Sequence, residues 1–447
     1  MDWIIFILGL LPYTLEIYFL SFALRYKKPQ LADTIRRPFV SVHVPIHKEP
    51  PHIVINTLKS LSDQDYKNYE VLALVNNTPQ IDLRKPIKDF CQEKSSILRY
   101  YHIQTSGYKG GTLNKAIHLS DPKTEIISVV DSDYQVSKDF IKKGVSYFEG
   151  NTAIVQFPQD YRDFPDTVFF KAMYISYRYF FAVIMRMCHV LGAVAFMGTV
   201  GFIRSDAIKK AGNWSEKVLT EDSEAGLRIV LRGFKGKYVD ESIGKGLMPL
   251  SFFSCRQQRF RWAYGNAQTL IKHFFALTFG KELSFKQKIA FWIQNTAWHT
   301  PLIISLSLTF FSYLNYLFSH FGAGLLTGFL ISRVYSFLWL YRKIDKLSIY
   351  ESILGLIFYL SLFFPMSYAP MRVLIPYKVS FYRTPKIKQR ESAKYFGEIF
   401  MLFLTLLLFL VSIKEGKWIN VYTCTLSIIF FACFFWIVKK GRSSMLP

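Results

Sequence analysis

The stretch EIISVVDSDY, residues 125–134, joins a short β-branched run to two aspartates. The run predicts a buried strand, and Asp131 and Asp133 predict its end. Similar runs at 39–46 and 69–77 alternate with helical stretches. This alternation predicts an α/β domain with a mainly parallel sheet. Ligands bind such folds at the carboxyl ends of the strands, which is where the two aspartates fall.

The composition indicates that this domain belongs to a membrane protein. The 447 residues are 51% hydrophobic and 17% aromatic, and the formal net charge is +23. Apolar residues gather near the start of the chain and again from residue 289, with a soluble mixture between them. We expect an N-terminal transmembrane helix (1–26), a soluble domain (27–250), interfacial helices (251–288) and a C-terminal transmembrane bundle (289–447).

Five spans of about 20 residues are expected in total. They are 3–24, 289–318, 323–341, 396–414 and 418–438. The segment 349–375 is ambiguous, and we interpret it as interfacial or re-entrant, interrupted by Pro365 and Pro370. This choice keeps the basic stretch 372–394 on the same side as the C-terminal lysines.

Basic residues after the first span place the soluble domain in the cytoplasm of a multi-pass protein of the plasma (inner) membrane. They are Arg25, Lys27, Lys28, Arg36 and Arg37. This topology accounts for the positive charge, so we expect membrane lipids and no nucleic acid as partners. Five cysteines without paired CxxC spacing give no sign of a zinc site.

Asp131 and Asp133 are candidates for a metal site. Two carboxylates one residue apart can share a hard divalent cation, Mg²⁺ or Mn²⁺, that bridges the oxygens of a diphosphate. The alternative is a polar turn that ends a strand.

The stretch LTEDSEAGLRIVLRGF, residues 219–234, predicts an amphipathic helix with Glu221 and Asp222 in its first turn. Carboxylates at this position commonly cap the helix and oppose its dipole. The alternative is that they act on a substrate.

The stretch SCRQQRFRWAYGN, residues 254–266, offers an amide, a cation and a large ring in one helical turn. Gln258, Arg261 and Trp262 suit hydroxyls, a phosphate and the face of a sugar. A basic aromatic helix on anionic lipid is the alternative, and Arg256 and Arg259 suit that role.

VVDSDY, LTEDSEAGLRI and QQRFRW, in this order and followed by membrane spans, resemble the D-x-D, T-E-D and Q-x-x-R-W motifs of processive family 2 glycosyltransferases. The resemblance is to cellulose synthase-like and β-glucan synthase-like proteins of the bacterial type. It extends through VPIHKEPP, GYKGGTLNKAI, VQFPQDYRD, FMGTVGF, GLMP and SFYRTPK, nearly the whole chain.

The resemblance implies a GT-A-like glycosyltransferase domain and a role for each matched residue. Asp131 and Asp133 would bind Mg²⁺ or Mn²⁺, and Asp222 would deprotonate the acceptor hydroxyl. The implied nucleotide-sugar-binding residues are His47, Glu49, Asn76, Asn77, Lys109, Gly110 and Arg261. The implied acceptor-binding residues are Glu221, Gln156, Gln159, Gln258 and Trp262.

Two further features bear on the donor. The family usually closes its second strand with an aspartate that recognises the base, and we expect Val75 at that position, followed by Asn76 and Asn77. The stretch SFYRTPK, residues 380–386, resembles the loop that moves over the nucleotide in cellulose synthases. We expect a similar cytoplasmic loop at 376–395.

The expected function is an inverting polysaccharide synthase that transfers a hexose from a UDP-sugar, UDP-glucose in the first instance, to a growing β-glycan and exports it. One base on one face of the sugar implies inversion. The alternative is a non-processive family 2 enzyme that adds one sugar to a lipid.

Overall fold

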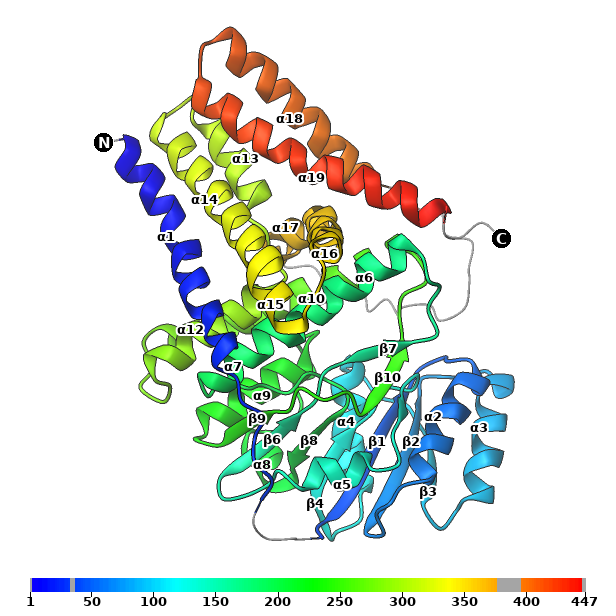
Figure 1. Cartoon of the computed structure of the whole chain (residues 1–447). Helices are drawn as coiled ribbons and strands as arrows, with labels where there is room; N and C mark the ends of the chain where they lie inside the picture. The colour runs from blue at the N-terminus through cyan, green and yellow to red at the C-terminus, as the bar shows by residue number, and fades with distance from the viewer. Residues whose placement is uncertain (1, 33–36, 376–394, 444–447) are drawn as a thin grey trace.

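The computed structural model describes residues 2–32, 37–375 and 395–443. Figure 1 shows an α/β domain that contains the strands and, next to it, a layer of long helices. The expected loop at 376–395 lies, except for Tyr395, outside the described residues.

A seven-stranded sheet forms the centre of the α/β domain, in the order β3-β2-β1-β4-β8-β6-β9. Neighbouring strands are parallel except where β8 pairs with β4 and β6. The expected mainly parallel sheet is therefore confirmed. The strands are β1 (Phe39–Ile46), β2 (Tyr69–Asn76), β3 (Leu98–Ile103), β4 (Thr124–Val129), β6 (Thr152–Gln156), β8 (Gly201–Arg204) and β9 (Lys235–Tyr238).

Helices cover both faces of this sheet, as the alternating side chains of β2 illustrate. Val71, Ala73 and Val75 pack in one core with residues of α2 and α3, whereas Leu72 and Leu74 pack on the other face with α4. Both faces are buried, which explains why the strand reads as a continuous apolar run. The helices are α2 (Pro51–Ser62), α3 (Ile81–Glu93), α4 (Tyr108–Leu119), α5 (Phe140–Val145), α8 (Ser205–Lys210) and α9 (Glu221–Leu231).

A small second sheet, in the order β5-β10-β7, connects the α/β domain to the helical layer. Its strands are β5 (Gln135–Val136), β7 (Asp160–Arg162) and β10 (Gly244–Leu247). β5 directly follows the two aspartates, and β10 leads into α10 (Phe252–Lys272). Ser251 caps α10 by accepting a hydrogen bond from the backbone N of Ser254 at 3.1 Å.

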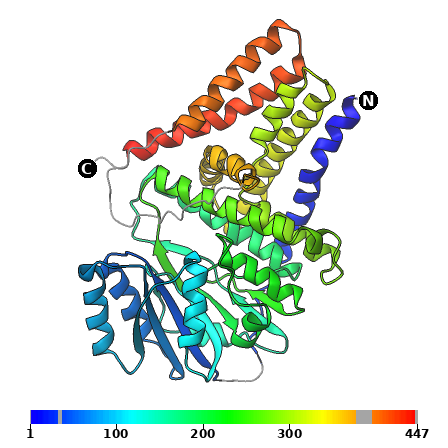
Figure 2. The same cartoon turned by 180° about the vertical axis from the view of Figure 1, so that it is seen from behind.

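Two long helical segments lie between the α/β domain and the outer helices. One is α6 (Val168–Tyr179), continued through a π-helical stretch (Phe180–Met185) into α7 (Arg186–Val190), and the other is α10. In Figure 2, α10 (green) lies across the top of the α/β domain and below α16 and α17 (gold). The QQRFRW stretch, residues 257–262, is thus on a helix packed from both sides.

Among the described residues, five helices are long and apolar enough to cross a membrane. The chain has the character of a multi-pass membrane protein. Four of the five match expected spans, and the fifth, Val168–Val190, was not predicted because it lies within a soluble-looking region. Of the residues in its apolar stretch, 78% are buried inside the protein. The five are Asp2–Arg25, Val168–Val190, Leu317–Asp345, Phe396–Lys414 and Trp418–Arg442.

The expected single span at 289–318 is wrong. The chain forms α12 (Phe285–Thr296) and the ten-residue α13 (Leu302–Phe311), separated by a break that ends at Pro301. Proline fixes its own φ and lacks an N–H donor, so it begins α13 rather than continuing α12. The ambiguous 349–375 segment forms α16 (Ile349–Ser361) and α17 (Phe363–Arg372), bent by 40°.

The remaining helices include α1 (Asp2–Leu20) and α14 (Leu317–Val334), which lie in the outer layer (Figure 1). α1 packs closely on α14, because Gly9 and Gly324 leave room for their backbones to touch. An ion pair between Glu16 and Arg333, both buried, also joins the two helices. The bounds are α1 (Asp2–Leu20), α11 (Phe274–Thr278), α14 (Leu317–Val334), α15 (Arg342–Asp345), α18 (Phe396–Lys414) and α19 (Trp418–Ser443).

Candidate active site

A cleft of about 560 Å³ lies at the carboxyl ends of β1, β2 and β4, next to α4, α9 and α10. It brings together segments up to 217 positions apart, from Pro45 to Trp262. Thirteen of the fifteen expected site residues line it. They are His47, Glu49, Asn76, Asn77, Lys109, Asp131, Asp133, Gln159, Glu221, Asp222, Gln258, Arg261 and Trp262.

Asp131 lies just beyond the end of β4. Its backbone N donates to Thr199 Oγ1 at 3.0 Å, and its Oδ1 accepts from Lys109 Nζ at 2.6 Å. Lys109 Nζ also donates to the backbone oxygen of Gly198 at 2.8 Å. Burial alone would lower the pKa of Lys109, but three nearby carboxylates raise it above its usual value. The cleft therefore holds a permanent cation beside Asp131.

Asp133 is buried and connects the large sheet to the small one. Its Oδ2 accepts a hydrogen bond from the backbone N of Leu247 at 2.9 Å. Arg162 donates to the backbone oxygen of Asp133 at 3.1 Å. Because Leu247 is the last residue of β10, this hydrogen bond links Asp133 to the strand that leads into α10.

Glu221 and Asp222 form the first turn of α9. Asp222 Oδ1 accepts from the backbone N of Ser223 at 2.8 Å, so the helix start does hold this carboxylate. The other oxygen, Oδ2, lies against Gly198, where φ is +80° and a β-carbon would overlap it. The same side chain thus accepts from a backbone N–H at the start of α9 with one oxygen and places its other oxygen against Gly198.

The two carboxylates have raised pKa values. Burial raises the pKa of Glu221 to about 8, and the charge of Asp222 adds to the rise, while Lys109 opposes it. Burial also raises the pKa of Asp222, and Lys109 again opposes the change. A carboxylate with a raised pKa is a better proton acceptor near neutral pH.

α10 supplies the opposite wall of the cleft. Gln258 is hydrogen-bonded to the hydroxyl of Tyr177, and burial lowers the pKa of Arg261 to about 10. The Trp262 ring lies with its centroid 5.3 Å from that of Trp298. A smaller cavity of about 60 Å³ continues past Asp222 and Trp262 and is lined by Phe180, Phe181 and Trp298, among others.

Hydrogen bonds, most of them to backbone atoms, fix the side chains at the end of the cleft near β1 and β2. His47 Nδ1 is hydrogen-bonded to the backbone oxygen of Asn76 at 3.0 Å. Asn76 donates to Thr112 Oγ1 at 2.7 Å and accepts from Thr105 N at 3.1 Å. Asn77 has a φ of +48°, a conformation that asparagine tolerates, and donates to Thr105 O at 2.8 Å.

The model of the family described as glycosyltransferase like family 2 matches residues 37–265 of this chain. The chain belongs to glycosyltransferase family 2. The matched region contains all three motifs of the cleft.

The relatives of this family 2 chain include plant enzymes. The probable glucomannan 4-beta-mannosyltransferase 14 of Arabidopsis thaliana is 26% identical over 276 residues, which cover 59% of this chain and 50% of that protein. Glucomannan 4-beta-mannosyltransferase 7 of the same organism is 24% identical over 243 residues, covering 53% and 44%. The chain spans about half the length of the relatives it matches.

A solved structure supports the GT-A-like fold expected for a family 2 protein. The mannosyltransferase of Pyrobaculum calidifontis, solved in complex with GDP-Man and Mn²⁺, has a TM-score of 0.55 at 16% identity. The similarity covers 79% of this chain and 96% of the other. At this identity it concerns the fold.

The two aspartates fit a divalent metal held partly by a substrate. Among residues 2–32, 37–375 and 395–443, no three His, Cys, Asp or Glu side chains are grouped closely enough to hold a metal ion. Asp131 and Asp133 nevertheless supply hard carboxylate oxygens at an open cleft. Mg²⁺ and similar ions commonly use one or two carboxylates together with substrate phosphates and water.

Two expected site residues do not line the cleft. Gln156 is fully buried in β6, where its amide donates to Phe157 O and Thr199 O and accepts from Met197 N. Gly110 packs against the backbone of Ser215, which leaves no room for a β-carbon. Both residues shape the wall of the cleft from behind.

Three other expectations also need correction. Val75 is fully buried in the core, so Asn76, rather than Val75, closes the second strand at the cleft. Arg256 is paired with Glu398 of α18, its Nε 2.5 Å from Oε1. Arg259 is fully buried, so it cannot lie on lipid headgroups.

Sequence reasoning missed several residues that complete the site. Gly198, Thr199 and Leu247 hold Lys109, Asp131 and Asp133 through backbone or hydroxyl contacts, which leave no distinct side-chain signature. In the sequence, their segments FMGTVGF and GLMP are distinguished only by the resemblance to processive family 2 glycosyltransferases. Trp298 lies in the apolar run 289–318, which the sequence predicts to be a single membrane span, so nothing singled it out.

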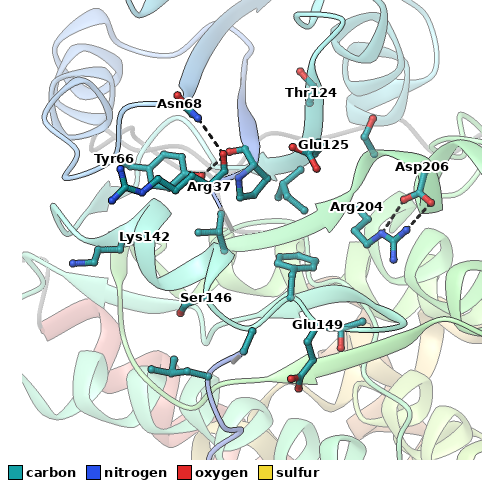
Figure 3. Close-up of a pocket in the computed structure, with 18 of the residues that line it drawn as sticks. Arg37, Tyr66, Asn68, Thr124, Glu125, Lys142, Ser146, Glu149, Arg204 and Asp206 are labelled. Atoms are coloured by element: carbon teal, nitrogen blue, oxygen red, sulfur yellow. Dashed lines mark hydrogen bonds and ion pairs between the residues drawn. The ribbon is translucent and has the colours of Figure 1, made fainter. Parts of the chain in front are cut away.

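A larger hollow of about 1400 Å³ lies at the opposite, amino-terminal edge of the sheet (Figure 3). Arg204 and Asp206 pair there at 2.8 Å, and Asn68 donates to the backbone oxygen of Arg37 at 3.0 Å. None of the expected site residues lines it.

Proposed function

We propose that this chain is a membrane-embedded, inverting glycosyltransferase that transfers a hexose from a nucleotide sugar to a growing β-linked glycan. The observation that carries the proposal is that the carboxylates of β4, the carboxylates of α9 and the Gln-Arg-Trp face of α10 line one cleft. Donor, base and acceptor groups would thus meet in one place.

Asp222 is the general base of this proposal. Attack on the anomeric carbon requires removal of the acceptor's hydroxyl proton, and Asp222 Oδ2 would take it. Its Oδ1 is engaged by Ser223 N, which fixes the direction of the carboxylate. One base on one face of the sugar gives inversion.

Lys109 and Arg261 stabilise the leaving diphosphate. Both are cationic side chains in the cleft, where low exposure to water strengthens their interaction with developing negative charge. Asp131 and Asp133 would hold Mg²⁺ or Mn²⁺, which supplies further positive charge to the diphosphate when bound. His47, Glu49, Asn76 and Asn77 would bind the nucleoside part of the donor.

Trp262 provides the stacking face for the acceptor sugar, with Gln159, Gln258 and Glu221 as hydrogen-bonding groups. The smaller cavity beyond Asp222 is lined by aromatic side chains and leads toward the helical layer. At about 60 Å³ this cavity is smaller than a hexose. The preference for a processive, exporting enzyme over one that adds a single sugar to a lipid therefore rests on the Q-x-x-R-W motif of α10.

The preferred donor is a mannosyl nucleotide, GDP-mannose. The sequence alone favoured UDP-glucose, but the relatives are glucomannan mannosyltransferases and the fold neighbour was solved with GDP-Man. We place the α/β domain on the cytoplasmic side of the plasma (inner) membrane, because nucleotide sugars are made in the cytoplasm.

The test is nucleotide release by the purified protein in nanodiscs, with Mg²⁺ or Mn²⁺, across GDP-mannose, UDP-glucose and other nucleotide sugars. Sizing and linkage analysis of the product follow. A long β-linked polymer from one donor supports the proposal. A single-sugar lipid product, or no release from any donor, contradicts it.

A further inference from the structure

The segment 271–288, which runs from the end of α10 through α11 into α12, carries large apolar side chains on its surface. Phe275, Phe279 and Phe285 are 77%, 69% and 70% exposed. The Phe275 ring centroid lies 5.6 Å from that of Phe274 and 6.4 Å from that of Phe279, so these rings form one patch. An exposed apolar patch of this kind marks contact with a partner or a membrane.

The same segment is basic. Its charged aspartate, glutamate, lysine and arginine side chains are Lys272, Lys281, Glu282, Lys286 and Lys288. Lys281 and Lys286 are exposed, each within two residues of an exposed phenylalanine. Lysines interleaved with aromatic rings suit an anionic lipid surface, because the rings enter the acyl boundary while the ammonium groups meet the headgroup phosphates.

The contact of Phe285 with α1 places the segment at the level where a bilayer would end. The Phe285 ring centroid lies 6.4 Å from that of Phe19, in the last turn of α1, and Figure 1 shows α12 beside this end of α1. Phe19 precedes Arg25 by six residues, roughly 10 Å of helix. Tyr18 is 60% exposed, as aromatic side chains at a membrane boundary commonly are. The patch thus lies between an apolar span and the basic residues that follow it.

Hydrogen bonds join this segment directly to α9. Lys272 Nζ and His273 Nε2 lie 2.7 Å and 2.8 Å from Glu224 Oε1. Glu224 is fully buried two positions after Asp222, and its other partner is Arg228 of the same helix. Because Phe274 follows His273 immediately, the patch is continuous with the residues that hold Glu224.

We propose that the segment 271–288 docks on anionic phospholipid and that docking stabilises the start of α9 through Glu224. The partner is a lipid surface, because the exposed rings and lysines lie at the level of the last turn of α1. Glu224 is a positioning residue in this inference, since it does not line the cleft. Docking stands independently of the proposed function, whereas its effect on catalysis rests on that function.

Docking is measured with a fluorescent label on the full-length protein in nanodiscs. An NBD label on Glu282→Cys is quenched by spin-labelled lipid where the segment meets the bilayer. A Cys433→Ser background suits this label, because the other four cysteines are buried. Quenching should increase by about half when about one third of the phosphatidylcholine is replaced by phosphatidylglycerol. A label on Ser96→Cys, which precedes β3 at the amino-terminal edge of the sheet, should not be quenched.

Paired substitutions separate the charge of the segment from its apolar surface. Lys281→Gln with Lys286→Gln should abolish the increase caused by phosphatidylglycerol. Phe275→Ser with Phe279→Ser should lower quenching about twofold in both kinds of nanodisc. Lys85→Gln with Lys88→Gln is the matched control, because it removes the same charge from exposed positions on α3 and should behave as wild type.

The link to α9 is measured by hydrogen exchange and by kinetics. Phosphatidylglycerol should slow exchange of the α9 backbone amides about threefold and raise kcat for nucleotide release about threefold. The donor KM should stay within about twofold. Glu224→Gln should remain docked, as the label reports, but lose both responses. If Glu224→Gln does not fold, Lys272→Gln removes one contact to Glu224 from an exposed side chain and should halve both responses.

The outcomes keep this inference separate from the proposed function. Quenching of the wild-type label that is absent, or equal with and without phosphatidylglycerol, overturns docking. Responses of Glu224→Gln equal to those of wild type overturn the link to α9. If the wild-type protein transfers no sugar from any donor, the proposed function fails, and the label and the exchange of α9 amides still decide docking and the link.

Discussion

The cavities at the two edges of the large sheet differ in volume and, in the opposite sense, in how deeply their acidic side chains are buried. The hollow at the amino-terminal edge is larger, about 1400 Å³ against about 560 Å³ for the cleft at the carboxyl edge. Its acidic side chains are at least partly exposed, and two of them pair with neighbouring cations, Asp206 with Arg204 and Glu149 with Lys237. At the carboxyl edge, by contrast, Asp133 and Glu221 are buried.

The difference follows from the direction of the strands. In a parallel sheet the loops after successive strands converge at the carboxyl edge, so side chains distant in sequence meet there. The start of α9 directs its backbone N–H groups toward that edge and holds Asp222. Asp133 and Glu221 at the carboxyl edge are therefore shielded from water, whereas Asp206 and Glu149 at the amino-terminal edge are open to it.

The strongest test of this contrast is Asp222→Asn. Loss of the proposed general base should lower kcat by about a thousandfold. Nucleotide affinity should remain near that of wild type, because Asn keeps the size of the side chain. The measurement is nucleotide release beside nucleotide binding by calorimetry. Asp206→Asn at the other edge is the control, and a variant at position 222 with a tenth of the wild-type rate would refute the assignment.

The sequence predicted the carboxyl edge well, for a physical reason. A β-branched run that ends in aspartates predicts both the strand and its polar end, and parallel topology then brings several such ends together. Thirteen expected residues accordingly line the cleft. The antiparallel β8 was not foreseen, since a four-residue strand leaves little pattern to read.

The predictions that failed concern side chains whose surroundings are set by segments distant in the sequence. Gln156 has the polarity of a ligand-binding residue, but its amide is used by backbone groups of Met197 and Thr199. Arg259 follows Gln258 on the same helix, yet α10 is packed on more than one side, so a charge that seemed suited to lipid is buried. Hydropathy likewise could not reveal that a new helix begins after Pro301 and that Trp298 lies beside the smaller cavity.

A smaller effect is expected from the aspartates of β4. Asp131→Asn and Asp133→Asn should each weaken Mn²⁺-dependent nucleotide binding by about a hundredfold, in the range observed when metal sites lose a supporting group. Calorimetry with and without Mn²⁺ measures this loss. Chelation of metal with EDTA should bring the wild-type protein to the level of the variants. Equal Mn²⁺ dependence in all three proteins would exclude these two carboxylates as ligands.

Lys109→Met should change both the donor KM and the pH profile. Asp222 must be deprotonated to act, so kcat/KM falls as the pH falls through its raised pKa. The Lys109 cation lowers that pKa, and its removal should shift the acidic limb upward by about one pH unit. The donor KM should rise about tenfold as one phosphate contact is lost.

Lys115→Met is the matched control for this change. Lys115 lies exposed on the same helix and does not line the cleft. Its substitution should leave the acidic limb in place. A Lys109 variant with an unmoved limb would show that the two groups do not interact in the working enzyme.

The smallest expected effect concerns stability. Glu221, with a pKa raised from 4.5 to about 8, holds a proton in the folded state that the unfolded chain releases between those values. The folded protein therefore loses stability as the pH rises from about 5 to about 8. Glu221→Gln should remove this loss and raise Tm at pH 8 by about 3 °C relative to wild type.

Glu149→Gln at the amino-terminal edge, which replaces a half-exposed glutamate, should reproduce the wild-type slope of Tm against pH in thermal scans at pH 5 to 8. If the Glu221→Gln slope equals that of wild type, Glu221 is ionised in the folded protein, and burial does not raise its pKa.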